Sequence, residues 1–414
     1  MTLKRHQLAS LTLVLVAALL SSAVAVSAGQ QARSVRIKAQ VGGGERAVAY
    51  GRSRLLLVPQ GGNGITRVKL DGSVDRSFGA NGTVAIASED AVVTADGKIF
   101  VATTSCPRCG AGPKSEARVT RLLPSGRLDH SFGGDGSVDV PFGRRYNYAE
   151  AVALTADGDI LLGGIRVDRP SNLGVADFSL AVARIRADGS LDRSFGGDGV
   201  SVLPGGGEIG ALDIAATPTG GVVVDGGDAF YGSFLWRLHR DGSTDHGFGR
   251  SGIVEIRRPG AKDDEFGIYA PEIVVLPGGK LLAVAAGSGY PRNHVAALRL
   301  SPDGTLDRTY GDDGWAVAGA FRSRAKGLMP LSGGALAVAA SFTGARGKSD
   351  FGLLVFDHDG DLDRRFGTNG RCRAGLSSGG YEAVDVALVD RHPVVIGHNE
   401  ADSRLLSCPA LRRR

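Results

Sequence analysis

The chain has 414 residues, of which 43% are hydrophobic and 63 are glycine, and its formal net charge is +5. The apolar fraction excludes an intrinsically disordered chain, and the glycine content is typical of a protein rich in turns. A charge this small, with no basic stripe except the terminal Arg412-Arg413-Arg414, argues against a nucleic-acid-binding protein.

The first 28 residues have the pattern of a secretory signal peptide. Lys4 and Arg5 precede an apolar run from Leu8 to Leu20, and Val26-Ser27-Ala28 supplies small or apolar residues before a cleavage site at Gly29. The run is too short to span a membrane comfortably, and no similar run follows. We therefore expect residues 29–414 to form one domain that is not transmembrane and is secreted or, in a double-membrane bacterium, periplasmic.

One segment, ADGSLDRSFGGDG at 187–199, recurs in six versions along the chain. The steps between copies are 53 to 63 residues, measured between the first glycines Gly72, Gly126, Gly189, Gly242, Gly304 and Gly360. A repeat of this length that carries several short strands is typical of a propeller or a solenoid.

Each copy combines residues suited to a tight connection between strands. Asp188-Gly189 predicts a turn because glycine reaches positive φ without a Cβ clash. A later aspartate of the copy is expected to accept backbone N–H bonds within the loop, as in Asx turns. An aromatic residue three positions on predicts a ring buried between neighbouring blades. These positions hold Asp75, Asp129, Asp192, Asp245, Asp307 and Asp363, and Phe78, Phe132, Phe195, Phe248, Tyr310 and Phe366.

The alternative role for these aspartates is calcium binding. Asp357, Asp359 and Asp361 alternate as in an EF-hand loop. However, Leu362 stands where that loop needs glycine, and no ligand glutamate follows at the required spacing. The pattern therefore favours a structural role.

Short apolar strands and turns alternate along the rest of the chain. Strand candidates begin at Val35–Ala39, and hairpins of two strands follow near Ala47, Ala91, Ala151, Leu212, Ile273, Leu328 and Val384. The last hairpin precedes a single strand, Arg404–Leu411, so one of seven four-strand sets lacks a strand. Val35–Ala39 supplies it. The sequence therefore predicts an all-β, seven-bladed β-propeller whose last four-stranded blade is closed by the N-terminal strand.

Two phrases, ADGSLDRSFGGDG and AVALTADGDILLGG (Ala151–Gly164), resemble the delta-60 repeat of uncharacterised bacterial proteins. The resemblance covers nearly all of residues 29–414. It implies a β-propeller, and it implies no activity and no catalytic residues.

Alternate connections of an up-and-down blade lie on opposite faces. The short turns and the repeat loops therefore share one face, here called the regular face, and the variable connections share the other, the irregular face. Because loops on a rigid scaffold usually carry binding residues, we expect the ligand site on the irregular face.

A glutamate stands just before the first hairpin strand in six units, at Glu45, Glu89, Glu150, Glu208, Glu272 and Glu382. If these strands line the central axis, their carboxylates crowd together and raise one another's pKa or recruit a cation such as Ca²⁺. The alternative is a set of solvated strand starts that share nothing. Loop aromatic and basic residues suit glycan or peptide recognition, although such residues also occur without a ligand. The ligand-binding candidates are Tyr148, Glu150, Glu208, Tyr231, Glu272, Tyr290, Arg292 and Glu382.

The four cysteines of an exported chain predict disulfides. Cys106 and Cys109 form a CxxC pair outside any thioredoxin-like context, so we expect them to bridge one loop. A second bridge, Cys372–Cys408, would tie down the C-terminal strand if the two strands meet the required geometry.

The sequence contains no G-x-S-x-G elbow, P-loop, dinucleotide fingerprint or paired-histidine metal motif. It favours a monomeric, secreted propeller that binds an extracellular glycan, peptide or protein without catalysis. One alternative is a hydrolase or lyase that acts on a carbohydrate or lactone with the glutamates as acid and base. Another is a passive surface protein.

Overall fold

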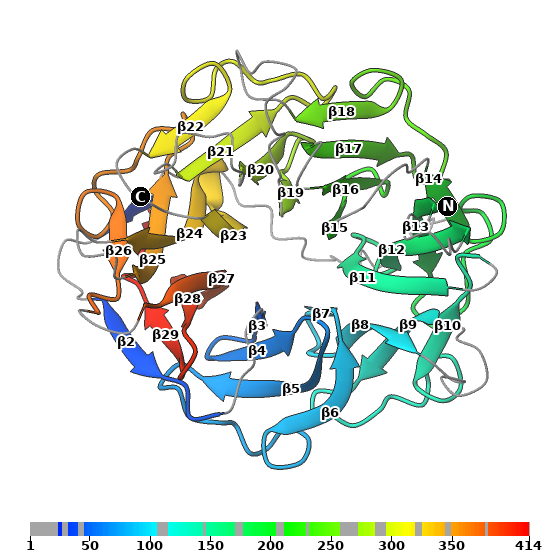
Figure 1. Ribbon diagram of the computed structural model, residues 1–414, viewed down its shortest axis with the longest axis horizontal. Coiled ribbons are helices and arrows are strands. Elements are labelled where there is room, and N and C mark those ends of the chain that lie inside the picture. The colour runs from blue at the N-terminus through cyan, green and yellow to red at the C-terminus, as the bar shows by residue number, and fades with distance from the viewer. Residues whose placement is uncertain are drawn as a thin grey trace, which may run out of the picture.

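The computed structural model describes residues 24–26, 32–39, 45–105, 115–143, 146–169, 177–203, 211–228, 232–256, 272–285, 295–318, 325–343, 349–376 and 380–413. These residues form seven four-stranded antiparallel sheets and one two-stranded sheet. The four-stranded sheets stand as blades around a central axis, so the predicted seven-bladed propeller is confirmed (Figure 1).

The first strand of each blade lies nearest the axis, and the following strands step outward (Figure 1). The innermost strands of blades 1 to 7 are β3 (Glu45–Tyr50), β7 (Asp90–Val93), β11 (Tyr146–Leu154), β15 (Ala211–Ala216), β19 (Ile273–Val275), β23 (Ala325–Pro330) and β27 (Glu382–Val389). The second strands are β4 (Arg54–Pro59), β8 (Ile99–Ser105), β12 (Ile160–Arg169), β16 (Val222–Asp228), β20 (Leu281–Ala285), β24 (Leu336–Thr343) and β28 (His392–His398).

The two outer strands complete each blade. The third strands are β5 (Gly62–Lys69), β9 (Glu116–Leu122), β13 (Asp177–Ile185), β17 (Gly232–Leu238), β21 (Val295–Leu300), β25 (Ser349–Phe356) and β29 (Ser403–Ser407). The outermost strands are β6 (Thr83–Ser88), β10 (Ser137–Val140), β14 (Val200–Leu203), β18 (Ile253–Ile256), β22 (Trp315–Ala318), β26 (Arg371–Arg373) and, in blade 7, β2 (Arg33–Arg36). A short 3₁₀ turn, η1 (Ser332–Gly334), joins β23 to β24.

The ring closes in blade 7, where the N-terminal strand β2 pairs with β29. This confirms the expected closure, although the paired residues are Arg33–Arg36 rather than Val35–Ala39. Just past β2, Ile37 N–H still donates to Ser403 O of β29, and Lys38 N–H then donates to Gly72 O in the repeat loop of blade 1. Val24–Val26 (β1), within the expected signal segment, pairs with Leu411–Arg413 (β30).

The predicted aromatic residues are buried between blades. All six rings, including Phe78 and Tyr310, have no exposed surface. Apolar side chains from adjacent blades surround them; Tyr310 of blade 5, for example, shares a cluster with Leu336 and Phe356 of blade 6. The core is therefore a set of layers between blades, as radial repetition of flat sheets requires.

The repeat aspartates form the predicted Asx turns. Each accepts the N–H of the residue two positions later, as Asp75 does from Ser77 and Asp307 from Thr309, both at 3.2 Å. An arginine on the third strand also pairs with the aspartate in five copies, with Nε–Oδ2 distances of 2.7–3.4 Å. These residues, here called the clamp arginines, are Arg67, Arg121, Arg184, Arg237 and Arg299.

Each clamp arginine also reaches the next blade. Its Nη1 donates to a backbone carbonyl in the following repeat loop, for example from Arg121 to Ala187 O at 2.6 Å. The repeat loops contact each other too, because Gly133 N–H donates to Asp188 O at 3.0 Å. A Cβ on Gly189 would lie only 2.5 Å from Gly133 N, and the φ of Gly189 is +97°, so this position requires glycine. The repeated segment is therefore an interblade joint.

The hairpin turns and the repeat loops share one face, as expected. Tyr50 Oη donates to Gly97 O in a hairpin turn and lies within hydrogen-bond reach of Pro124 O in a repeat loop, so both kinds of turn lie on the regular face. Within the described part of the chain, no helix is long and apolar enough to cross a membrane.

Candidate functional site

The axis carries a ring of charged side chains at the start of the innermost strands, toward the irregular face. One position per blade contributes, and equivalent positions hold Arg46, Asp90, Ala151, Asp213, Glu272, Gly327 and Asp385. The five charged residues are here called the axial collar. Arg46 Nη1 lies 2.8 Å from Asp90, and Arg46 Nη2 lies 3.6 Å from Asp213 and 3.8 Å from Glu272. One guanidinium therefore serves several carboxylates from different blades.

The collar carboxylates also join neighbouring blades through the backbone. Asp90 accepts the N–H of Val152 at 2.9 Å, Asp213 that of Ile273 at 2.9 Å, and Asp385 that of Ala47 at 2.7 Å. Glu272 accepts the N–H of Leu328 in the same way. The acceptor and donor always belong to consecutive blades, so the collar fastens the inner strands at the axis.

Burial opposes ionisation of several carboxyl groups of the collar. Burial raises the pKa of Asp385 to about 6 against the opposing charge of Arg46. Burial, and then the charge of Asp385, raises the pKa of Glu272 well above its usual value, and burial also raises that of Asp213. The pKa of Arg46 is raised, chiefly by Asp90. The raised pKa values mean that these collar carboxyl groups release their protons at a higher pH than the same groups do in water.

A second acidic pair lies beside the collar. Burial, and then the charge of Glu89, raises the pKa of Glu150 to about 7. Glu89 accepts the N–H of Gly61 at 2.8 Å, whereas Glu150 has neither a hydrogen bond nor an ion pair among the described residues. Glu150 occupies a β-bulge between Ala149 and Ala151, and bulges redirect side chains out of the regular alternation.

The structure brings together only part of the predicted glutamate ring. Glu89 and Glu150 lie close enough to interact. When the blades are aligned, these two glutamates stand one residue before the collar position, whereas Glu272 occupies the collar position itself. Glu382 is exposed, and Tyr148 is 37% exposed on β11. Glu45 begins β3, and its side chain lies outside the described residues, as do Glu208, Tyr231, Tyr290 and Arg292.

Sequence reasoning missed the aspartates that make most of the collar. Counting back from the hairpin turns aligns Asp90, Asp213 and Asp385 with Arg46, and this alignment was the available signal. The motif that the sequence did offer as calcium-like is a turn. Oδ1 of Asp357 accepts the amides of Asp359 and Asp361, at 3.1 and 3.0 Å, as in an Asx turn.

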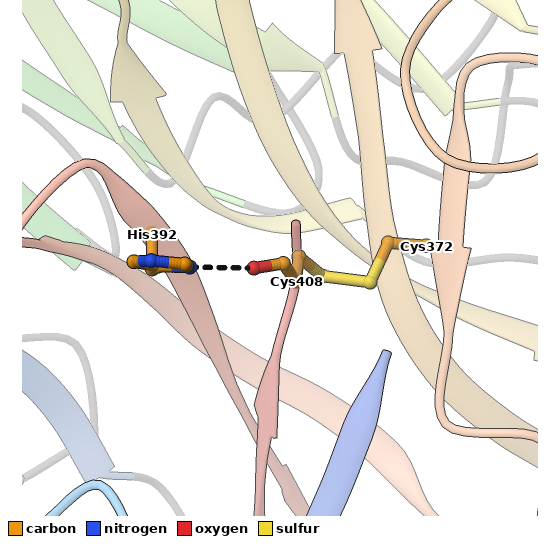
Figure 2. Close-up of a disulfide and its surroundings, with 3 residues drawn as sticks. All are labelled: Cys372, His392 and Cys408. Carbon is orange, nitrogen blue, oxygen red and sulfur yellow. Dashed lines mark hydrogen bonds between the residues drawn. A yellow bond between two sulfur atoms is a disulfide. The ribbon is translucent and has the colours of Figure 1, made fainter. Parts of the chain in front are cut away.

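The predicted Cys372–Cys408 disulfide is present, with a Cα–Cα distance of 5.9 Å (Figure 2). It joins β26 of blade 6 to the residue that follows β29 of blade 7 by one position. Cys408 O lies 3.2 Å from Nδ1 of His392, and both cysteines are buried. Cys106 and Cys109 lie outside the described residues.

Three comparisons place this fold among known proteins. Residues 277–310 match the model of a family described as "Domain of unknown function (DUF5122) beta-propeller". No curated protein matches significantly. Among solved structures, the chain is similar to one titled "Streptogramin B lyase structure", with a TM-score of 0.50 and 11% identity over 91% of this chain and 97% of that one.

Two further solved structures are similar at lower scores. The C-terminal WD40 domain of Sif2 has a TM-score of 0.44 and 10% identity, over 90% of this chain and 99% of that one. A protein of unknown function from Dyadobacter fermentans has a TM-score of 0.44 and 12% identity, over 92% of this chain and 99% of that one. The similarity to the lyase shows a common fold alone. The short family match supports an uncharacterised β-propeller family, whereas the delta-60 name stays a prediction.

Proposed function

We propose that this protein is an exported interaction scaffold that binds an extracellular glycan, peptide or protein on its irregular face, near the axis, without catalysis. The observation that carries the proposal is Glu150. This carboxyl group is largely buried beside a second glutamate and has no partner among the described residues. An uncompensated acidic group is unfavourable in the free protein, and a ligand that donates hydrogen bonds or brings a positive charge removes that cost.

The two faces support this assignment. On the regular face, the repeat aspartates are satisfied by Asx turns and, in five of six copies, by clamp arginines of their own blades. On the irregular face, carboxyl groups outnumber Arg46 and retain raised pKa values. Among the residues that the structure describes, these acidic groups near the axis are therefore the ones best placed to gain from a partner.

The direct test is a glycan and peptide array probed with the protein and two variants. Glu150→Gln should lose binding because it removes the acceptor charge, whereas Glu382→Gln should bind normally because Glu382 is exposed on a different blade. Equal binding by both variants, or no bound ligand with the unsubstituted protein, would contradict the proposal.

Calcium is the cation to include. A ligand that binds only the folded state raises the unfolding temperature by mass action. If calcium raises the unfolding temperature, and if chelator reverses this rise and Glu150→Gln abolishes it, Ca²⁺ is the partner of the Glu150 carboxyl group. If glycan or peptide binding persists in chelator, the ligand itself is the partner of Glu150.

A second function, acid–base catalysis on a carbohydrate or lactone, is favoured by the same residue. A carboxyl group with a pKa of about 7 is matched to general acid catalysis at neutral pH. An enzyme would lose turnover in Glu150→Gln while still binding substrate, and its pH–rate profile would bend near pH 7. A scaffold would lose binding and show no turnover.

A further inference from the structure

We propose a second binding site, for a zwitterion of the α-amino acid or short-peptide class, at the seam where β2 closes blade 7. A hollow of about 530 Å³ lies there, between the segment that leaves β2 and the turn that joins β28 to β29. This volume is in the range of small-molecule sites. The hollow shares no residue with the collar or the Glu89–Glu150 pair, so either proposal can fail without the other.

The two walls carry opposite charges. Arg36 and Lys38 line the hollow from the segment after β2, and Glu400 lines it from the facing turn. Neither Lys38 nor Glu400 has an ion-pair partner among the described residues. A ligand with a carboxylate and an ammonium group can satisfy both walls at once, which a simple anion or a simple amine cannot do.

Neighbouring contacts hold these walls in place. Arg36 Nε lies 2.8 Å from Asp402 Oδ2, and Tyr381 donates to the other oxygen of Asp402. Asp402 is therefore already engaged, and Glu400 is left as the acceptor for an ammonium group. The side chain of Arg36 is 64% exposed, and its ion pair with Asp402 uses Nε, so its terminal nitrogens can be offered to a carboxylate.

The turn itself is rigid. Asn399 Oδ1 accepts the amides of Ala401 and Asp402, at 2.9 and 2.7 Å, and Asn399 N–H donates to Asp402 O. His398, which also lines the hollow, has its Nδ1 3.0 Å from Ser403 Oγ. A site that is ordered before the ligand arrives loses less entropy on binding.

Three apolar residues, Ile37, Ala39 and Ala401, complete the lining. They offer contact to an aliphatic side chain, which makes leucine a better first probe than glycine.

The test is titration calorimetry of the protein with L-leucine, L-leucine methyl ester and N-acetyl-L-leucine. We expect binding of L-leucine only, because the ester lacks the carboxylate and the acetyl derivative lacks the ammonium group. Lys38→Gln and Glu400→Gln should each weaken binding about tenfold or more, the usual effect of losing one charged hydrogen bond. Arg33→Gln, on β2 but outside the hollow, is the matched control and should bind normally.

The outcomes separate the possibilities. Equal binding of L-leucine and its acetyl derivative would overturn the zwitterion assignment in favour of a simple anion site. Binding that survives both substitutions, or no heat with any probe, would overturn the site. Because Lys38 and Glu400 are exposed, their variants should fold, and an unchanged unfolding temperature without ligand verifies this.

Discussion

The interfaces between blades 1 to 6 and the seam around blade 7 join similar strands by different means. Each of the five regular interfaces is crossed by a clamp arginine that ends on a carbonyl of the next repeat loop. Blade 6 has Val355 at the equivalent position, and blade 7, which β2 completes, has no repeat loop between its third and fourth strands. A disulfide crosses that interface instead (Figure 2).

The difference shows what the clamp needs. The arginine is useful only where the next blade offers a loop carbonyl, and the blade assembled from both chain ends cannot offer one. There the structure combines a covalent bond with the β2–β29 pairing. The interface between blades 6 and 7 therefore depends on a disulfide, which persists in an oxidising compartment, and this agrees with the proposed export.

The largest expected effect on stability comes from removing the disulfide between blades 6 and 7. Replacement of Cys372 and Cys408 by alanine should lower the free energy of unfolding by about 3–4 kcal/mol, because the bond closes a loop of 36 residues. Urea unfolding of both proteins measures the difference. A loss below about 1 kcal/mol would mean that β2 alone secures blade 7.

Breaking one regular interface should cost somewhat less. Arg299→Leu removes the buried partner of Asp307 and the bond to His358 O, while Lys280 stays 2.7 Å from Asp307, so we expect a loss of about 2 kcal/mol. Arg308→Leu is the matched control, because Arg308 lies in the same repeat with 77% of its side chain exposed, and it should change stability little. Equal losses from both variants would contradict the clamp.

The collar and the repeat loops should respond to pH in opposite directions. Burial opposes ionisation of Asp75, but hydrogen bonds from Ser77 and the charges of Arg67 and Arg54 outweigh it and lower its pKa to about 2. Such groups stabilise the fold above their unfolded pKa near 4, and this contribution is lost as the pH falls toward 2. Asp385, with a pKa raised to about 6, favours folding below pH 4 and loses that contribution as the pH rises through 6.

Stability should therefore be greatest between about pH 4 and 5 and decline toward pH 8. Urea unfolding across this range measures the profile. Asp385→Asn should flatten the decline between pH 5 and 7, because the amide does not titrate, and leave the acid side unchanged. A wild-type profile that rises from pH 5 to 8 would show that the collar carboxyl groups are ionised without penalty.

Much of the fold could be predicted from the sequence, because the repeat fixes local geometry. The DG turn, the Asx aspartate and the aromatic residue each act within one loop, and the count of strands implied closure by the N-terminal strand. The collar could not be predicted in the same way. Asp90, Asp213 and Asp385 meet only after seven blades close, and the β-bulge at Glu150 depends on pairing with β12 rather than on local sequence.

The smallest expected effect concerns Tyr310, the one tyrosine among the six aromatic residues of the repeat loops. Its hydroxyl is buried and has no hydrogen-bond partner among the described residues, and burial raises its pKa. A buried, unsatisfied hydroxyl costs about 1 kcal/mol or more, so Tyr310→Phe should raise the free energy of unfolding by about that amount. The reverse change in a regular copy, Phe132→Tyr, should lower it similarly, because Phe132 is equally buried. Urea unfolding of both variants measures these opposite signs, and destabilisation by Tyr310→Phe would show that the hydroxyl contributes a bond to the blade 5–6 interface.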